Sequence, residues 1–312
     1  MKHANGHPYT HSAGRLRAFA KKTGDVRLGS VRVHDVARFI ETPGTSPLTK
    51  QFKYGLLRNF FLYCKGRYPM GEAPMPPMPP CPPPSAFIPR IYSRTEIRAL
   101  LRAIEPALSG GRCVISARTY RTFLLFLYAT GTLVSEARRM LLKDVDLERK
   151  RITIRGATFG RVRTVPIGFD LCRILASYIG YRNRLKISTS DRLFIDNSGQ
   201  SMQWRTMQIT FRRVRKLAGF GSEDIQRLPR MKDLRNAFVV HRLNAWSKRG
   251  VDLRGMVPPL AAYLGLVGLT STERYLRLTP ERFRHQLNIL SPRSGGMRWG
   301  DNPKLMRFLA QL

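Results

Sequence analysis

The stretch that decides the fold is Lys232-Asp233-Leu234-Arg235-Asn236-Ala237-Phe238, which is followed further along by Leu264-Gly265-Leu266 and Glu273-Arg274-Tyr275. Arg235 lies at the start of a predicted helix, where its guanidinium can bind a phosphate. The hydroxyl of Tyr275 can attack a phosphate to form a covalent link. In a chain dominated by positive charge, this pairing suggests DNA strand exchange.

Positive charge is the most pronounced property of the composition. The 312 residues include 55 Lys+Arg against 20 Asp+Glu, a formal net charge of +35. A polyanion is the natural partner for such a chain, and nucleic acid is the commonest polyanion. Hydrophobic residues make up 43% of the sequence, which indicates a globular protein with a real core, and the length favours two domains.

Other classes of protein are disfavoured. The sequence contains no apolar run of the roughly 18 residues that a transmembrane helix needs, and its start lacks the apolar core of a signal peptide. The four cysteines are far apart and without paired metal-ligand spacing, which predicts reduced thiols and no metal site. We therefore expect a cytoplasmic, nucleoid-associated protein that does not interact with membranes.

Residues 1–69 predict a helical DNA-clamp domain. Helices are expected around 15–20, 33–40 and 48–63. The apolar face of the third helix is assigned to Phe52, Leu56, Phe60 and Tyr63. The opposite faces carry the cations expected to contact DNA, Lys50, Lys53 and Arg58. A solvated charged surface would explain any single one of these cations equally well.

Residues 70–90 are so rich in proline that neither a helix nor a central strand can form there. The segment is therefore predicted to be an extended, semi-rigid linker between two domains. The alternative interpretation is a polyproline ligand for a partner domain.

Residues 91–291 predict a second domain that is mainly α with a small antiparallel sheet. Ser93-Arg94-Thr95-Glu96 fits a capping box, 120–129 is an apolar helix, and 151–155 with 163–167 forms a hairpin. A helix at 206–218 carries the cations Arg212, Arg213, Arg215 and Lys216, which suggest phosphate contacts, although a solvated face is the alternative. Residues 292–312 predict a tail helix that docks either on a neighbouring protomer or on its own domain.

These features resemble the tyrosine recombinase (phage integrase) family over roughly residues 10–290. The segment from Ala129 to Glu136 is similar to the family's first motif box, and the hairpin is similar to its catalytic β-hairpin. Asp233-Leu234-Arg235, Leu264-Gly265 and Tyr275-Leu276 are similar to its second box. The resemblance implies the family's two-domain architecture, a helical core-binding domain followed by a catalytic domain.

The resemblance also implies a chemistry. In this family two arginines hold the scissile phosphate, a hairpin lysine protonates the leaving 5′ oxygen, and a tyrosine attacks to form a 3′-phosphotyrosyl link. No cofactor is needed, because the covalent bond keeps the energy of the broken phosphodiester. Arg235 falls on the second arginine, Tyr275 on the nucleophile, and Lys232 on a position that is usually histidine.

The sequence departs from the family at three other positions. Leu133 stands where the first arginine belongs, Ala157 or Thr158 where the hairpin lysine belongs, and Leu266 where a histidine or tryptophan belongs. Arg161 and Arg163 lie close to the lysine position, but a guanidinium is a poor proton donor, so they are expected to contact the DNA backbone.

We therefore expect a DNA-binding recombinase or integrase of a mobile element that takes part in site-specific recombination or transposition. Its catalysis should be weakened, because each missing charge-stabilising donor typically costs about a hundred- to a thousandfold in rate. Such a protein would act on double-stranded DNA in a homo- or hetero-oligomer with active recombinase subunits. Whether it is itself an enzyme stays open, since the alternative is a fully active recombinase that uses Tyr275. A nucleoid or transcription factor has no sequence feature in its favour.

Overall fold

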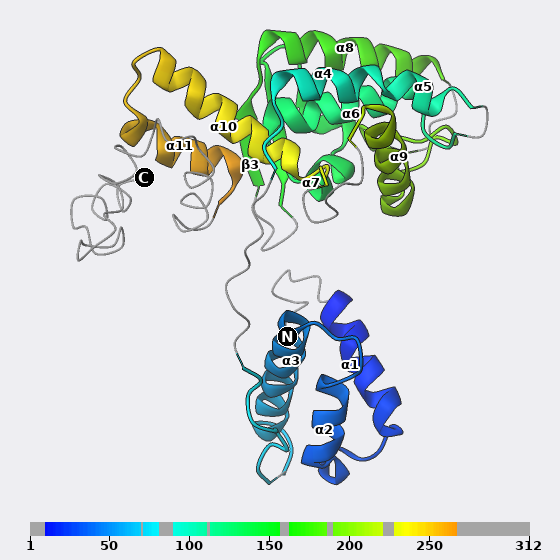
Figure 1. The fold of residues 1–312 in the computed structure, drawn as a ribbon, viewed down its shortest axis with the longest axis vertical. Coiled ribbons are helices and arrows are strands. Elements are labelled where there is room, and N and C mark those ends of the chain that lie inside the picture. The colour runs from blue at the N-terminus through cyan, green and yellow to red at the C-terminus, as the bar shows by residue number, and fades with distance from the viewer. Residues whose placement is uncertain are drawn as a thin grey trace. The chain divides into compact units, whose positions relative to one another are not determined.

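The computed structural model describes residues 10–69, 71–80, 90–110, 113–156, 162–185, 190–220 and 228–266 (Figure 1). The chain divides into two compact units, residues 1–87 and 88–312, and the division falls inside the proline-rich segment 70–90. The expected tail helix within 292–312 lies outside the described residues. No helix in the described ranges is both long and apolar enough to cross a membrane.

The described part of the N-terminal unit is a small helical bundle of α1 (Thr10–Thr23), α2 (Val33–Ile40) and α3 (Pro47–Lys65), with a 3-10 turn η1 (Leu28–Ser30) between the first two. Helix α3 begins where the Ser46 side chain accepts a hydrogen bond from the Thr49 amide, 3.3 Å away, and Pro47 supplies the first turn. The bundle is held together by a core of aromatic and aliphatic side chains, Phe19, Val36, Phe39, Ile40, Leu57 and Phe61.

The predicted orientation of the third helix is partly wrong, since Leu56 and Phe60 face the core as expected but the other assigned residues do not. Lys53, which was expected on an exposed face, is buried, and its Nζ donates to the Phe39 carbonyl at 2.7 Å. Burial, followed by the nearby charge of Lys22, lowers its pKa. Phe52 and Tyr63, which were assigned to the core, are instead about half exposed and are covered by arginine guanidiniums. Cation–π contacts thus allow aromatic rings to occupy the outer face of α3.

The proline-rich segment is only partly the free spacer that the composition predicted. Residues 71–80 contain neither helix nor strand, as expected. Ala73 and Met75, however, pack against the core of the N-terminal unit, and the Gln51 side chain donates to the Pro80 carbonyl at 3.4 Å. This portion therefore belongs to the N-terminal unit, because its apolar side chains find a surface to cover there.

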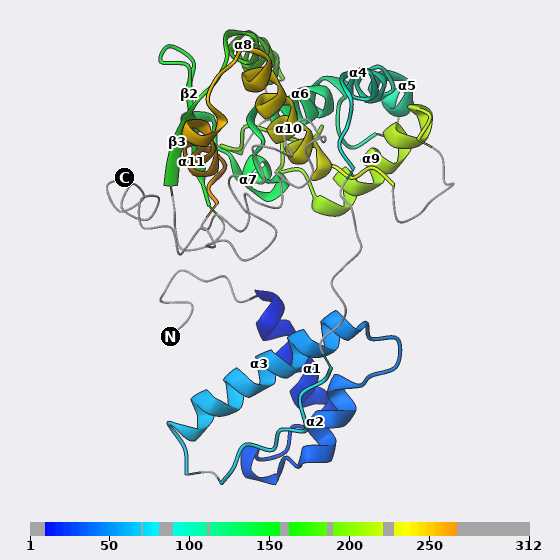
Figure 2. The same ribbon diagram turned by 60° about the vertical axis from the view of Figure 1, so that its left-hand side comes forward.

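The described part of the C-terminal unit is mainly helical with a three-stranded antiparallel sheet, as the sequence predicted (Figures 1 and 2). Its helices are α4 (Arg94–Arg102), α5 (Ile104–Leu108), α6 (Ala117–Thr130), α7 (Val134–Arg139), η2 (Leu142–Asp144), α8 (Phe169–Arg184), α9 (Trp204–Leu217), α10 (Asp233–Lys248) and α11 (Leu253–Leu264). Its strands are β1 (Val145–Asp146), β2 (Arg151–Arg155) and β3 (Val162–Pro166), in the order β1-β2-β3.

Helix α6 is the centre of this unit. It contacts both α8 and α10, and an aromatic core surrounds it (Figure 1). Tyr120, Phe123 and Phe126 on α6 are completely buried, and two of them pack edge-on against Phe194. The capping box predicted for α4 is present, since the Ser93 hydroxyl accepts from the Glu96 amide and the Glu96 carboxylate accepts from the Ser93 amide. The aromatic packing fixes α6 within the unit, and the candidate site is built at the C-terminal end of this helix.

Candidate active site

The site is built around the tight turn that joins α6 to α7. Gly131 ends α6 in the left-handed conformation with φ of 60°, and its amide donates to the Leu127 carbonyl. Thr132 is buried, with its amide bonded to the Thr130 hydroxyl, and α7 begins directly after Leu133. This turn brings the first motif box against α10, because a Cβ at position 131 would lie only 2.4 Å from a ring carbon of Phe238.

Gly131→Ala is expected to destabilise the C-terminal unit by about 1–3 kcal/mol. The substitution adds a strained backbone conformation to a direct clash with Phe238. Thermal unfolding of the purified protein measures the effect. Gly219→Ala is the matched control: it also has a positive φ, but nothing lies within 4 Å of the added carbon. Equal losses in the two variants would show that only the backbone conformation matters at Gly131.

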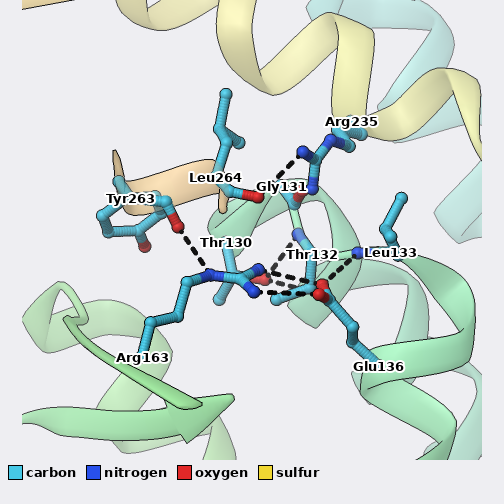
Figure 3. Close-up of polar contacts among 9 residues, drawn as sticks. All are labelled: Thr130, Gly131, Thr132, Leu133, Glu136, Arg163, Arg235, Tyr263 and Leu264. Atoms are coloured by element: carbon cyan, nitrogen blue, oxygen red, sulfur yellow. Dashed lines mark hydrogen bonds and ion pairs between the residues drawn. The ribbon is translucent and has the colours of Figure 1, made fainter. Parts of the chain in front are cut away.

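A buried ion pair ties α7 to β3. The Glu136 carboxylate accepts from both terminal nitrogens of Arg163, each at 2.9 Å, and also from the Leu133 amide at the start of α7 (Figure 3). The Nε of Arg163 donates to the Tyr263 carbonyl near the end of α11. Arg163 therefore joins three elements. Three of its five N–H donors are used inside the protein, and its contact with the DNA backbone stays a prediction.

The close packing at Arg163 depends on a second glycine. Gly265 has φ of 69°, and a Cβ there would lie 2.7 Å from a terminal nitrogen of Arg163. Glycine is therefore required after Leu264, because α11 ends directly against the Arg163 guanidinium and leaves no room for a side chain.

Arg235 lies where the second motif box meets the first. Its side chain is buried, and its two terminal nitrogens donate to the Gly131 carbonyl at 2.8 Å and the Leu264 carbonyl at 2.9 Å (Figure 3). It is therefore not a surface residue in an exposed ion pair. A guanidinium fixed by two carbonyl groups holds a positive charge at a defined point, which is the arrangement that phosphate binding requires.

Two further positions of the predicted catalytic set, 133 and 232, are close in sequence to the residues that Arg235 joins. Leu133, at the position expected to be arginine, is 45% exposed and offers no donor. Lys232 is exposed at the N-cap of α10, one turn before Arg235. Tyr275 and Arg161 lie outside the described residues.

Tyr263 lies beside this arrangement, and its backbone carbonyl accepts from Arg163 (Figure 3). Its hydroxyl donates to the Pro166 carbonyl at 3.2 Å, and its ring stacks on Phe238. Burial raises the pKa of this hydroxyl. A hydroxyl that is engaged and harder to deprotonate is a poor nucleophile.

The other cations predicted to contact DNA differ in exposure. Arg58, Arg212, Arg213 and Lys216 are exposed, Lys50 is half-buried, and Arg215 is half-buried with a bond to the Pro229 carbonyl. The described ranges contain no cluster of three or more His, Cys, Asp or Glu side chains suited to a metal ion.

Sequence reasoning missed the groups that support the site. Glu136 was taken only as the end of the first motif box and as part of a helix start, and Tyr263 was not considered. Asp233, which is fully buried, accepts two hydrogen bonds from the Arg230 side chain and one from the Arg230 amide, so it fixes the start of α10. The signal was present, because Glu136 and Asp233 each lie in the first turn of a helix, where acidic residues are enriched.

Comparison with known proteins identifies the family. The phage integrase family profile matches residues 93–285, more than half of the chain. The chain belongs to the phage integrase family. Among similar phage integrase relatives, a putative integrase/recombinase y4rB of Sinorhizobium fredii is 29% identical over 80% of this chain and 78% of its own length. The tyrosine recombinase XerD of Vibrio cholerae is 26% identical over 80% of this chain and 76% of its own.

Solved structures share the fold. The XerH site-specific recombinase, in a post-cleavage complex with its palindromic difH substrate, superposes with a TM-score of 0.60 at 20% identity, over 88% of this chain and 77% of that one. The Tn1549 transposon integrase, in complex with a circular intermediate DNA, gives 0.59 at 17% identity, over 93% of this chain and 96% of that one. The tyrosine recombinase fold predicted from the motifs is thereby confirmed.

Proposed function

We propose that this phage integrase family member binds double-stranded DNA and takes part in site-specific recombination or integration of a mobile element. Its own strand cleavage is weakened, and it works beside active recombinase subunits. The observation that carries the proposal is the contrast at the α6–α7 turn. The Arg235 guanidinium and the Glu136–Arg163 pair are in place, whereas Leu133 supplies no donor.

The support for a DNA partner comes from charge and from relatives. The chain carries a net +35, and exposed cations lie on α3 and α9. The XerH and Tn1549 structures hold DNA in each case. A lambda integrase of the same fold was solved as a dimer and as a tetramer on DNA, which supports an oligomer on the substrate.

In the proposed reaction the Tyr275 hydroxyl attacks the scissile phosphorus. The phosphorus–O5′ bond breaks, the 5′ oxygen leaves with a proton, and a 3′-phosphotyrosyl link forms. Arg235 and Lys232 stabilise the charge that develops on the phosphate oxygens. With leucine at 133 and no lysine at 157 or 158, the developing charge and the leaving oxygen have fewer donors, so the step is slow.

Tyr275→Phe is expected to abolish covalent adduct formation on a nicked duplex. The nick lets the short fragment with the free 5′ hydroxyl diffuse away, so any phosphotyrosyl link is trapped and can be counted by denaturing electrophoresis. Wild-type protein should form the adduct slowly, and the phenylalanine variant should bind DNA equally well without forming it. An adduct that persists in Tyr275→Phe would contradict this assignment of the nucleophile. Rapid and complete conversion by wild-type protein would favour the fully active recombinase instead.

DNA affinity is expected to fall steeply with salt, and the steepness should depend on α9. Each phosphate contact contributes about 0.9 to the slope of log affinity against log salt, so Arg212→Gln combined with Arg213→Gln should reduce the slope by about two. Lys53→Met is the matched control, because it removes a charge whose Nζ is bonded inside the N-terminal unit. Fluorescence anisotropy with a labelled duplex gives the slopes. A slope that is unchanged in the α9 variant would remove this helix from the interface.

A further inference from the structure

A groove on the C-terminal unit lies outside the candidate active site. It runs between α6 and α8 and encloses about 610 Å³, a volume within the range of ligand-binding pockets. In both views α8 forms the edge of this unit opposite α7, which carries Glu136 (Figures 1 and 2). Its lining includes none of the residues of the candidate active site.

Arginines form the rim of this groove. The Arg118 guanidinium donates to the Ser177 hydroxyl at 2.7 Å and lies 4.8 Å from the centre of the Tyr181 ring. Arg121 donates to the Leu101 carbonyl at 3.1 Å. All these partners are neutral, so they orient the two guanidiniums without offsetting their positive charge. Guanidiniums oriented in advance bind carboxylates at a lower entropic cost.

The third rim arginine, Arg173, has a weak acidic partner. Asp170 lies 3.5 Å away, and the two side chains are 69% and 89% exposed. A pair this exposed is worth little, so a carboxylate from outside can replace Asp170. Three arginines against one aspartate leave the lining positively charged.

The groove also has apolar lining. Two half-buried side chains, Leu125 on α6 and Ile174 on α8, form what we call its floor. A DNA backbone presents phosphates and sugars but no aliphatic side chain to cover such a floor. A peptide segment with both carboxylates and leucine-like side chains satisfies the rim and the floor together.

We propose that this groove docks an acidic amphipathic segment of a partner protein. The carboxylates of the segment pair with Arg118, Arg121 and Arg173, and its apolar side chains cover Leu125 and Ile174. The surface gives a strand-exchange protein a way to contact a protein partner while its DNA-binding cations remain free.

The test uses the full-length protein and two fluorescein-labelled peptides in fluorescence anisotropy. One peptide repeats glutamate and leucine, and the other has every leucine replaced by serine, so that their charges are identical. Ionic strength is kept at about 0.15 M, where exposed charges are screened beyond about 8 Å. The leucine peptide should bind about tenfold more tightly than the serine peptide. Arg118→Gln combined with Arg173→Gln should weaken leucine-peptide binding by about tenfold or more.

Two further variants make the outcome specific. Arg249→Gln removes an exposed charge at the end of α10 and should leave peptide affinity unchanged. Asp170→Asn removes the competing carboxylate and should strengthen binding about two- to fivefold. The proposal would be overturned if the two peptides bound equally well. It would also be overturned if Arg249→Gln weakened leucine-peptide binding as much as the double variant of Arg118 and Arg173 does. If the double variant of Arg118 and Arg173 lost affinity for duplex DNA but not for the leucine peptide, the proposal would be overturned too, because the groove would then be a second nucleic-acid surface.

Discussion

Glu136→Ala is expected to lower the free energy of unfolding of the C-terminal unit by about 3–5 kcal/mol. The carboxylate is 5% exposed and binds both terminal nitrogens of Arg163, which is itself 17% exposed. Removing one member of a buried ion pair leaves the other charge desolvated without its partner, and this costs more than the pair contributes to stability. The amide of Leu133 also loses its acceptor, so the start of α7 is weakened at the same time.

Urea unfolding followed by tryptophan fluorescence measures this loss for the correct unit, since all the tryptophans of the sequence lie after residue 88. Glu136→Gln should cost less, because its amide oxygen still accepts one hydrogen bond. Glu136→Leu combined with Arg163→Met should recover much of the stability, because replacing both charges leaves none buried alone. A double variant as unstable as the sum of its single variants would show that Glu136 and Arg163 act independently.

The elements around this pair could be predicted from sequence because their signals are local. Gly131 after an apolar helix indicates a left-handed helix end, and Ser93 with Glu96 indicates a helix start. Alternation in 151–155 indicates a strand that is buried on one face. Each pattern lies within a few residues, so these elements can be predicted without knowing which distant residues they contact.

The contacts that assemble the site were not predictable in the same way. Arg163 and Glu136 are 27 residues apart, and Arg235 and Gly131 are 104 apart. In a chain with 55 cations, no local pattern shows which arginine turns inward. Arg163 was assigned to DNA because it is basic and close to a motif position, whereas its partners come from α7 and α11.

Two helices show how packing overrides local preference. Helix α11 begins at Leu253 and contains Pro258 and Pro259, although local preference disfavours proline inside a helix. Each proline lacks an amide donor, and the packing of Leu253 and Val257 against α10 offsets that loss. In α3 the rings of Phe52 and Tyr63 lie outside the core to which they were assigned, because arginine stacking makes an exposed ring less costly.

Leu133→Arg is expected to raise the rate of covalent adduct formation on a nicked duplex about a hundred- to a thousandfold. That is the usual effect of one oriented donor at a position where charge develops. Leu133 is 45% exposed, so a longer side chain fits without repacking the core. Its amide is fixed by Glu136, and the neighbouring Gly131 carbonyl is bonded to Arg235, so the new guanidinium would start from a rigid turn.

The gain should stop short of full activity, because the hairpin lysine is still missing and donors that act together are not additive. Leu133→Gln is the matched control: it adds a polar side chain without a charge and should gain less than about tenfold. Adding Tyr275→Phe to Leu133→Arg should remove the adduct completely, which ties the gain to the proposed nucleophile. If Leu133→Arg binds DNA normally and forms adduct no faster than wild-type protein, the missing arginine is not what limits cleavage. The cause would then lie with the hairpin position or with the placement of Tyr275.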